Sequence, residues 1–252
     1  SRIPAEAFYG TPVLESIIIP DTVTQIDEYA FAACNQLKSV SLSENLMGMG
    51  YRAFLMCQSL QEIKIPPNLT ESYTSASQYK YAKGAWFENC YSLKKVTFEE
   101  GSTEIPSEAL KYTFGMNEIV FPGTLSYINS NAFESCISLT EVTLPKSITS
   151  IASKAFCECR SLRSITIPMN ISLLGSSYYE SPFSKCTGLE KVIFSEGLKK
   201  IPDGAFNSVY SLKYIILPES VENISYKSFY NCISLKTIDY AGSPNSFKNI
   251  KI

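Results

Sequence analysis

The chain has 252 residues, of which 45% are hydrophobic and 18% are charged. This composition can supply a continuous apolar core and argues against a disordered protein. The net charge of -2, with lysine and arginine scattered along the chain, argues against a nucleic-acid or anionic-lipid surface. No run of about 18 apolar residues occurs, so we expect no membrane insertion in this segment.

The sequence contains no histidine. Histidine is the commonest general base and the commonest metal ligand, and many serine and cysteine nucleophiles depend on it. Carboxylates such as Glu99 and Glu100 follow no pattern that places a pair in a pocket, and we interpret them as solvated. We therefore expect no catalysis and no bound cofactor.

A repeat in one register runs through the chain and decides the fold class. A mostly aromatic position, here called the anchor, recurs ten times. Seven of the nine intervals are 23 residues, and the other two are 33 and 27 residues. The anchors are Phe8, Phe31, Phe54, Phe87, Leu110, Phe133, Phe156, Phe183, Phe206 and Phe229.

Each coil follows its anchor with the same apolar pattern. Leucine or methionine stands six residues after the anchor, and isoleucine or valine stands nine residues after it. In one coil Val142 and Leu144 alternate with Glu141 and Thr143, and this alternation is typical of a half-buried strand. We expect a strand in every coil, with parallel strands stacked about 4.8 Å apart along one face.

The rest of each coil returns the chain to the next anchor. A second apolar pair, such as Ile148 and Ile151, is followed by a small residue, such as Ala155 before Phe156. A small residue suits a crowded turn. We expect a short helical or irregular turn at this point, on the face opposite the strands.

The segment 136–156, CISLTEVTLPKSITSIASKAF, resembles the 23-residue BspA-like, or treponemal-class, leucine-rich repeat. The resemblance covers nearly the whole chain and implies a right-handed leucine-rich-repeat solenoid of about ten coils. Such proteins are mostly secreted or surface proteins of host-associated bacteria and some protozoa, and several are adhesins. The family has no shared catalytic residues. We interpret residues 1–252 as a single solenoid, truncated at the N-terminus.

Two insertions interrupt the repeat, at about 70–84 and 174–182, and each falls just before an anchor. Their tyrosines lie among small polar residues, a mixture that antibody paratopes use for contact. The alternative is that surface insertions drift freely and their tyrosines pack back against the coil. We expect both insertions on one side of the solenoid, with candidate ligand contacts at Tyr73, Tyr79, Tyr81, Trp86, Tyr178 and Tyr179.

Toward the C-terminus, the outward positions of the expected strands become apolar. Most outward positions are serine, threonine, glutamate or lysine, but the C-terminal coils place Ile193, Tyr214 and Ile216 there. An apolar patch of this kind can mark a partner, or it can pack on further chain. These three residues are the second set of candidate ligand contacts.

Seven of the eight cysteines stand three residues after an anchor and belong to the repeat. The resemblance implies a buried asparagine or cysteine that helps to close the turn there, so we expect reduced, packed thiols. Neighbouring cysteines in stacked coils could also lie within disulfide range. Cys157 and Cys159 form CEC without a second pair at zinc-site spacing, so we expect no metal.

The tail at 240–252 resembles the irregular final motif of BspA-like arrays, with Phe247 at its aromatic position, and we expect a partial C-terminal cap. We predict a non-catalytic, monomeric binding module, extracellular or on the cell surface. Its ligand is expected to be a host or microbial protein or glycan. The alternative is a structural spacer or stalk that presents another domain.

Overall fold

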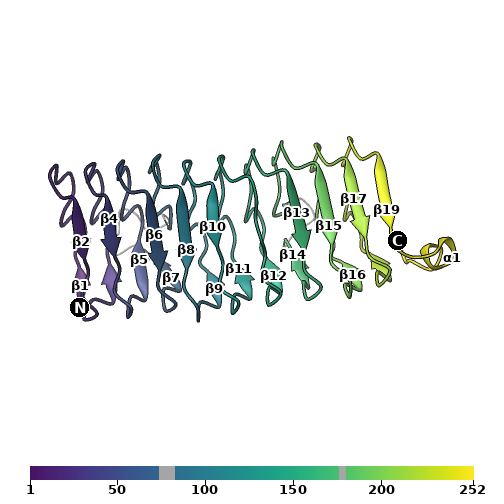
Figure 1. Cartoon of the computed structure of the whole chain (residues 1–252), viewed down its shortest axis with the longest axis horizontal. Coiled ribbons are helices and arrows are strands. Elements are labelled where there is room, and N and C mark those ends of the chain that lie inside the picture. Colours follow the sequence, from purple (N-terminus) through teal and green to yellow (C-terminus); the bar gives the residue numbers. More distant parts are fainter. Residues whose placement is uncertain (74–82, 176–179) are drawn as a thin grey trace.

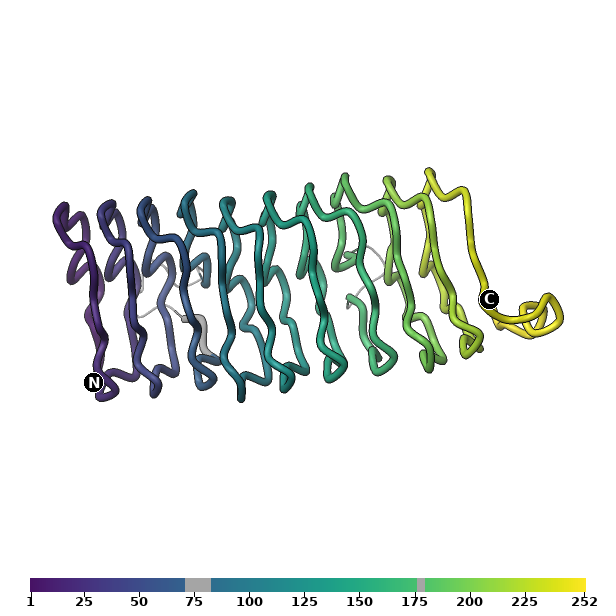
Figure 2. The backbone as a smooth tube through the Cα atoms, viewed as in Figure 1, coloured from purple at the N-terminus to yellow at the C-terminus, as the bar shows by residue number. Residues whose placement is uncertain are grey.

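The protein, in this computed structural model, is a parallel β-solenoid of about ten coils stacked along one axis (Figure 1). The structure describes residues 1–73, 83–175 and 180–252. Successive coils keep nearly the same outline, and the two termini lie toward opposite ends of the array (Figure 2). The predicted leucine-rich-repeat fold is confirmed.

The predicted strands form a first ladder along one side of the solenoid. Side chains alternate as expected, because Ile165 and Ile167 are buried while Ser164 and Thr166 are exposed. The strands of this ladder are β2 (Ser16–Ile18), β4 (Ser39–Ser41), β6 (Glu62–Ile65), β8 (Lys95–Phe98), β10 (Glu118–Val120), β13 (Ser164–Ile167), β15 (Lys191–Phe194), β17 (Tyr214–Leu217) and β19 (Thr237–Tyr240).

A second ladder of shorter strands was not predicted from the sequence. Except for β7, each strand contains the second residue of the apolar pair, such as Ile128 or Ile151, and two or three residues are too few to show a period. These strands are β1 (Arg2–Ile3), β3 (Gln25–Ile26), β5 (Gly48–Gly50), β7 (Glu71–Tyr73), β9 (Glu104–Ile105), β11 (Tyr127–Ile128), β12 (Ser150–Ile151), β14 (Leu173–Leu174), β16 (Lys200–Ile201) and β18 (Asn223–Ile224).

The anchors form a stack of rings through the core. Neighbouring rings lie nearly parallel, with centroids 4.9 Å apart for Phe31 and Phe54 and 5.3 Å apart for Phe183 and Phe206. All the anchors from Phe31 to Phe206 are fully buried. One coil therefore packs on the next mainly through its anchor, its leucine and its inward strand residues.

Irregular turns, and not helices, surround each anchor. The residues two before and two after an anchor have positive φ, as at Tyr29 (54°) and Ala33 (58°) around Phe31, with Ser181 before Phe183 as the exception. The main-chain N–H groups of Tyr29, Ala33 and Phe31 donate to carbonyls of the next coil, at 3.0, 2.7 and 2.8 Å respectively. Because these donors point along the solenoid axis, they are not available for the i to i-4 hydrogen bonds of a helix. Of the two alternatives predicted for this segment, the irregular turn is correct.

The first ladder is interrupted twice within the described residues. Strand β4 is not hydrogen-bonded to β6, and residues 141–144 form no strand between β10 and β13. The expectation of a strand in every coil is therefore wrong for the coil of Val142. Val142 and Leu144 are still buried, so the inward and outward pattern holds there without a hydrogen-bonded ladder. Apolar alternation encodes burial, whereas a strand also needs main-chain partners at its edges.

The second ladder is interrupted where the insertions lie. It divides into β1-β3-β5-β7, then β9-β11-β12-β14, then β16-β18, and each division follows a strand that leads into an insertion. Both insertions therefore leave the coil at the same point, immediately after the second-ladder strand. Most of the inserted residues lie outside the described residues, so their placement on one side of the solenoid stays a prediction.

The tail folds back toward the last coil after a four-residue helix, α1 (Pro244–Phe247). Ser243 caps this helix, and the ring of Phe247 packs edge-on against Tyr240 with centroids 5.4 Å apart. Lys251 then pairs with Asn223 and extends the second ladder by one bridge. That this segment acts as a C-terminal cap stays a prediction.

Candidate binding surface

Three apolar side chains lie together on the first ladder at its C-terminal end. Ile193 of β15 is paired in register with Ile216 of β17, and Tyr214 lies two residues before Ile216 on the same strand. The Tyr214 side chain is exposed, and the two isoleucines are half-buried. We call Ile193, Tyr214 and Ile216 the apolar patch. The structure brings these predicted contacts together on one face.

Polar and charged residues border the apolar patch. Tyr214 is paired in register with Lys191 on one side and Thr237 on the other. Beside it, Lys213 Nζ lies 2.8 Å from Glu190 Oε1, and this hydrogen bond lowers the pKa of the glutamate. One pair of neighbouring charges is thus neutralised, and the apolar side chains are the part of this face that water solvates least well.

The insertion tyrosines can be placed only in part. Tyr73 is the last residue of β7, where its main chain pairs with Gly50. The other four predicted contacts, Tyr79, Tyr81, Tyr178 and Tyr179, lie outside the described residues. Their role in binding stays a prediction.

Trp86 is a correction. Its side chain is completely buried, and its Nε1 donates a hydrogen bond to the main-chain oxygen of Met49 at 3.0 Å. The indole replaces the small residue that precedes most anchors, and it packs into the core beside Phe87. It was a candidate contact because it stands beside the first insertion. A ligand cannot reach it, so we remove it from the candidate contacts.

A row of exposed or half-buried side chains along another edge was missed. These residues stand four positions after their anchors, in the turn that leads to the first ladder, and the rings of Tyr91 and Phe114 stack with centroids 6.0 Å apart. Near the C-terminus, a pocket of about 260 Å³ lies in this row. The sequence feature that could have revealed this row is the fourth position after the anchor, which is apolar in half of the coils: Tyr91, Phe114, Ile137, Tyr210 and Ile233.

The cysteine ladder is an architectural feature. All eight cysteines are free and buried, as expected for packed thiols. Each repeat cysteine donates its Sγ hydrogen to the main-chain carbonyl of the anchor in the preceding coil. Cys57 donates to Phe31 at 3.2 Å, and Cys136 donates to Leu110 at 3.3 Å. Burial raises the pKa of Cys157 to about 11 and that of Cys232 to about 11.

These thiols are expected to be unreactive in the folded protein. The thiolate is the reactive form, and a raised pKa leaves little of it at pH 7 to 8. We expect slow reaction of the native protein with a thiol-specific reagent and rapid reaction of all eight cysteines after denaturation. Ser41→Cys on the exposed side of β4 is the control for an accessible thiol. Native modification as fast as that of Ser41→Cys would contradict the packing described above.

The described residues show no other recognisable chemical centre. No group of three or more potential metal-ligating side chains occurs among them. Glu158, which lies near Cys157, holds ion pairs with Lys185 at 2.9 Å and Arg160 at 2.8 Å. Within the same ranges, no helix is long and apolar enough to cross a membrane.

Comparison with known proteins gives a consistent result. The profile of the "BspA type Leucine rich repeat region" matches six copies, over residues 1–136, 70–182 and 176–251. A leucine-rich repeat protein from Bacteroides ovatus is 25% identical, with a TM-score of 0.58 over 93% of this chain and 68% of that one. The leucine-rich repeat protein TpLRR from T. pallidum is 22% identical, with a TM-score of 0.53 over 94% of this chain and 91% of that one. A search of curated proteins gives no match.

Proposed function

The chain belongs to the BspA-type leucine-rich repeat family, and from this premise we propose that it is a non-catalytic binding module, secreted or on the cell surface. Its ligand is a protein or a glycan of a host or of another microbe. The observation that carries the proposal is the apolar patch of Ile193, Tyr214 and Ile216 on the first ladder. Nucleic acid is not proposed as a ligand, because lysine and arginine are scattered along the sequence and the net charge is -2.

The apolar patch suits a binding role because it is both rigid and apolar. Its strands, β15 and β17, are paired in register with each other and with β13 and β19 on either side. A partner therefore meets side chains that are already ordered, and less conformational entropy is lost on binding. An exposed tyrosine beside aliphatic side chains is also a frequent composition for an interface centre.

The apolar patch is tested with a protein and glycan array, followed by substitution. We expect at least one specific ligand, and we expect Ile193→Glu with Ile216→Glu to weaken its binding by about tenfold or more. The matched control is Ile18→Glu, since Ile18 stands at the same position of its coil and is highly exposed. If the folded protein binds no member of the array, or if Ile18→Glu weakens binding as much as the double substitution does, the result counts against the proposal.

The insertions are a second part of the same proposal. We propose that their tyrosines extend the contact, because both insertions leave the solenoid after a second-ladder strand. Each insertion is shortened separately so that its interval returns to 23 residues. Loss of ligand binding with an unchanged melting temperature supports a contact role. Unchanged affinity in both shortened variants would show that the insertions do not contact the ligand.

A structural spacer is the second candidate function. It is favoured by the use of outward charges for contacts between coils, as in the pairs Lys38 with Glu15 at 2.9 Å and Lys95 with Glu118 at 2.5 Å. Such pairs stiffen the array without needing a ligand. Binding confined to a separate domain of the full-length protein would favour the spacer. Size-exclusion chromatography tests whether the module is the proposed monomer.

A further inference from the structure

Four positively charged side chains line one edge of the sheet that carries the apolar patch. Each stands at the first residue of a strand or immediately before it, and strands β13, β15, β17 and β19 are neighbours in that sheet. The main-chain N–H of Lys191 donates to the carbonyl of Arg163 at 3.3 Å, and that of Lys236 donates to the carbonyl of Lys213 at 3.0 Å. The four residues therefore follow one another from coil to coil. We call Arg163, Lys191, Lys213 and Lys236 the basic margin.

The basic margin holds more cations than carboxylates. The carboxylate of Glu190 lies within it and accepts a hydrogen bond from Lys213 Nζ at 2.8 Å. This bond lowers the pKa of Glu190, and the charge of Arg163 lowers it further. Among the described residues, Arg163, Lys191 and Lys236 make no ion pair. These three cations are therefore available to the carboxylates of a ligand.

The other carboxylates on this side lie outside the basic margin. Asp239 stands three residues after Lys236, about 10 Å farther along the strand at about 3.3 Å per residue. Glu196 and Glu219 follow the ends of β15 and β17. Glu141 lies on the preceding coil and makes no ion pair within the described part of the chain. The charge at the starts of these strands is therefore net positive.

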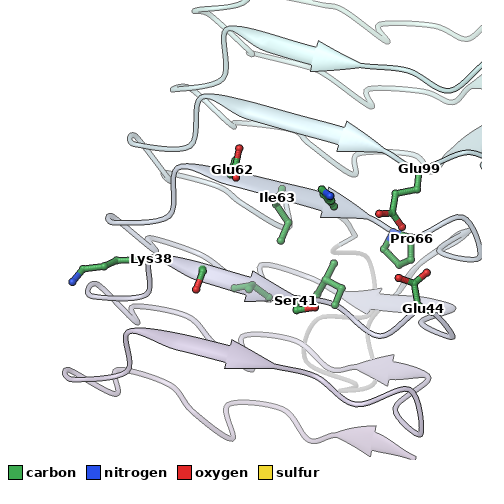
Figure 3. A pocket seen from close by; sticks show the side chains of 11 residues that line it. Lys38, Ser41, Glu44, Glu62, Ile63, Pro66 and Glu99 are labelled. Atoms are coloured by element: carbon green, nitrogen blue, oxygen red, sulfur yellow. The ribbon is translucent and has the colours of Figure 1, made fainter.

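The groove over β4 and β6 differs from the basic margin in this respect. Lys38, Glu62 and Glu99 lie around this groove of about 340 Å³ (Figure 3), and Lys64 lines it as well. Both signs of charge thus occur there, and Lys38 already pairs with Glu15 at 2.9 Å. Such a surface does not select a ligand by its charge, whereas the basic margin does.

A pocket of about 260 Å³ lies in the turns that lead to the basic margin. Its lining includes the exposed side chains of Tyr210 and Ile233. These residues stand three positions before Lys213 and Lys236 respectively. In the order of the chain, the basic margin therefore lies between this pocket and the apolar patch.

The pocket suits an apolar side chain. Ser211 is part of its lining, but its Oγ donates to the main-chain oxygen of Leu189 at 2.8 Å. Lys185 is also part of the lining and holds an ion pair with Glu158 at 2.9 Å. These polar groups are engaged within the protein, so burial of an apolar group against the tyrosine and isoleucine is the main contribution that the pocket offers a ligand.

We propose that the pocket, the basic margin and the apolar patch together bind one extended, acidic segment of a partner protein. An aromatic or large aliphatic side chain enters the pocket, carboxylates meet the basic margin, and an aliphatic side chain covers the apolar patch. The path from Tyr210 through Lys213 to Ile216 follows six residues of one coil, so it measures at most about 20 Å, and about seven residues span it. Because this surface includes the apolar patch, the proposal rests on the proposed function.

A protein segment fits this surface better than other polyanions do. Ile193 and Ile216 offer aliphatic contact, and burying the hydroxyl groups of a glycan or the phosphates of a nucleic acid against them costs free energy. The pocket beside Tyr210 has the same preference. A protein supplies carboxylates and apolar side chains within a few residues of one another, so it satisfies all three parts of the surface.

The probe is the fluorescent peptide Phe-Ser-Asp-Glu-Asp-Ser-Leu, used with its reversed sequence because the surface does not define the direction of the segment. Fluorescence anisotropy is expected to show saturable binding of at least one of the two, weakened by added salt. Neutral versions, with Asn and Gln in place of Asp and Glu, are expected to bind at least about fivefold more weakly. No binding of either acidic peptide, or equal binding of the neutral ones, overturns the proposal.

Substitutions in the basic margin test the charges. Lys191→Gln with Lys236→Gln is expected to weaken the acidic peptide by about threefold or more and to leave the neutral peptide unaffected. The matched control is Lys64→Gln with Lys146→Gln, which changes the net charge equally at exposed positions on other coils. Both variants are expected to melt like the parent. Equal losses in the two variants would overturn the proposal.

Substitutions in the pocket test the apolar contact. Tyr210→Ala with Ile233→Ala is expected to weaken the acidic peptide by about tenfold, and to have little effect once serine replaces its phenylalanine. Tyr91→Ala with Ile137→Ala is the control, because these side chains stand at the same position of earlier coils and are also exposed. If the pocket variant binds the acidic peptide as tightly as this control does, the pocket takes no side chain and the proposal is wrong.

The ligand found on the protein and glycan array separates this proposal from the proposed function. If Ile193→Glu with Ile216→Glu weakens that ligand while the margin and pocket variants retain it, the function stands and the acidic segment is overturned. If the patch variant weakens neither an array ligand nor an acidic peptide, both fail. Binding of a heparin oligosaccharide or an oligothymidylate, without binding of either acidic peptide, also overturns the proposal.

Discussion

Replacement of Trp86 with alanine is expected to lower the free energy of unfolding by roughly 3–5 kcal/mol. The indole is fully buried, so its removal leaves a cavity that the surrounding coils can fill only in part. The substitution also removes the hydrogen bond from Nε1 to the main-chain oxygen of Met49. Chemical denaturation followed by circular dichroism measures the loss.

The position of Trp86 gives this substitution a second expected effect. The first ladder is unpaired between β4 and β6, and the second is unpaired between β7 and β9. The two breaks fall at successive coil interfaces, and each interface keeps its other ladder and the main-chain hydrogen bonds of the anchor turns. Side-chain contacts such as those of Trp86 therefore contribute a larger share of the coupling here than between coils with both ladders closed. Stability in a repeat array is close to a sum over coils and interfaces. We expect the Trp86→Ala variant to unfold in two transitions, with the N-terminal coils unfolding first.

Tyr91→Ala is the control for both effects. Tyr91 lies in the same coil, but it is 54% exposed and its ring contacts mainly Phe114. Its loss is expected to cost less than about 1 kcal/mol, and the single transition is expected to remain. If the two substitutions cost the same, or if Trp86→Ala unfolds in one transition with a small loss, Trp86 does not couple the two groups of coils.

The sequence was sufficient to predict the fold because the buried apolar positions recur at the same place in each coil. The anchor and the leucine six residues later bury their side chains in nearly every coil, and the isoleucine or valine nine residues later is buried in six of the ten, so ten weak signals add up. Main-chain hydrogen bonding produces no comparable pattern of residue types in the sequence. This explains why the second ladder was missed and why a strand was wrongly expected around Val142, where the alternation is correct but the ladder is open.

The candidate sites were less predictable for a related reason. Ile193, Tyr214 and Ile216 were found because outward positions follow from the register. The missing pairing between β4 and β6 could not be predicted, because Val40 and Leu42 have the same residue types as side chains that other coils bury. Trp86 was misplaced because an apolar residue beside an insertion can face either way. In each case the burial of the side chain depends on the packing between neighbouring coils. The sequence of a single coil does not determine that packing.

The ion pair between Arg52 and Glu88 is expected to contribute to stability more than the other charged pairs, and it acts across the same junction. The guanidinium holds the carboxylate at two points, with Nε to Oε2 at 2.6 Å and Nη2 to Oε1 at 2.7 Å. The Glu88 side chain is only 11% exposed. Arg52→Ala therefore leaves a carboxylate in a poorly solvated place, and we expect a loss of roughly 2–4 kcal/mol in unfolding free energy.

A double-mutant cycle separates this ion pair from simple loss of packing. Arg52→Met keeps most of the apolar stem, and Glu88→Gln keeps the shape of the acceptor, so the double variant is expected to be more stable than Arg52→Met alone. The control is the pair of Lys199 and Glu222, whose side chains are 64% and 70% exposed. Lys199→Met is expected to change stability by less than about 1 kcal/mol, because water already solvates both charges. Additive losses at Arg52 and Glu88 would show that the two side chains act independently, and the junction would then be coupled by its apolar contacts alone.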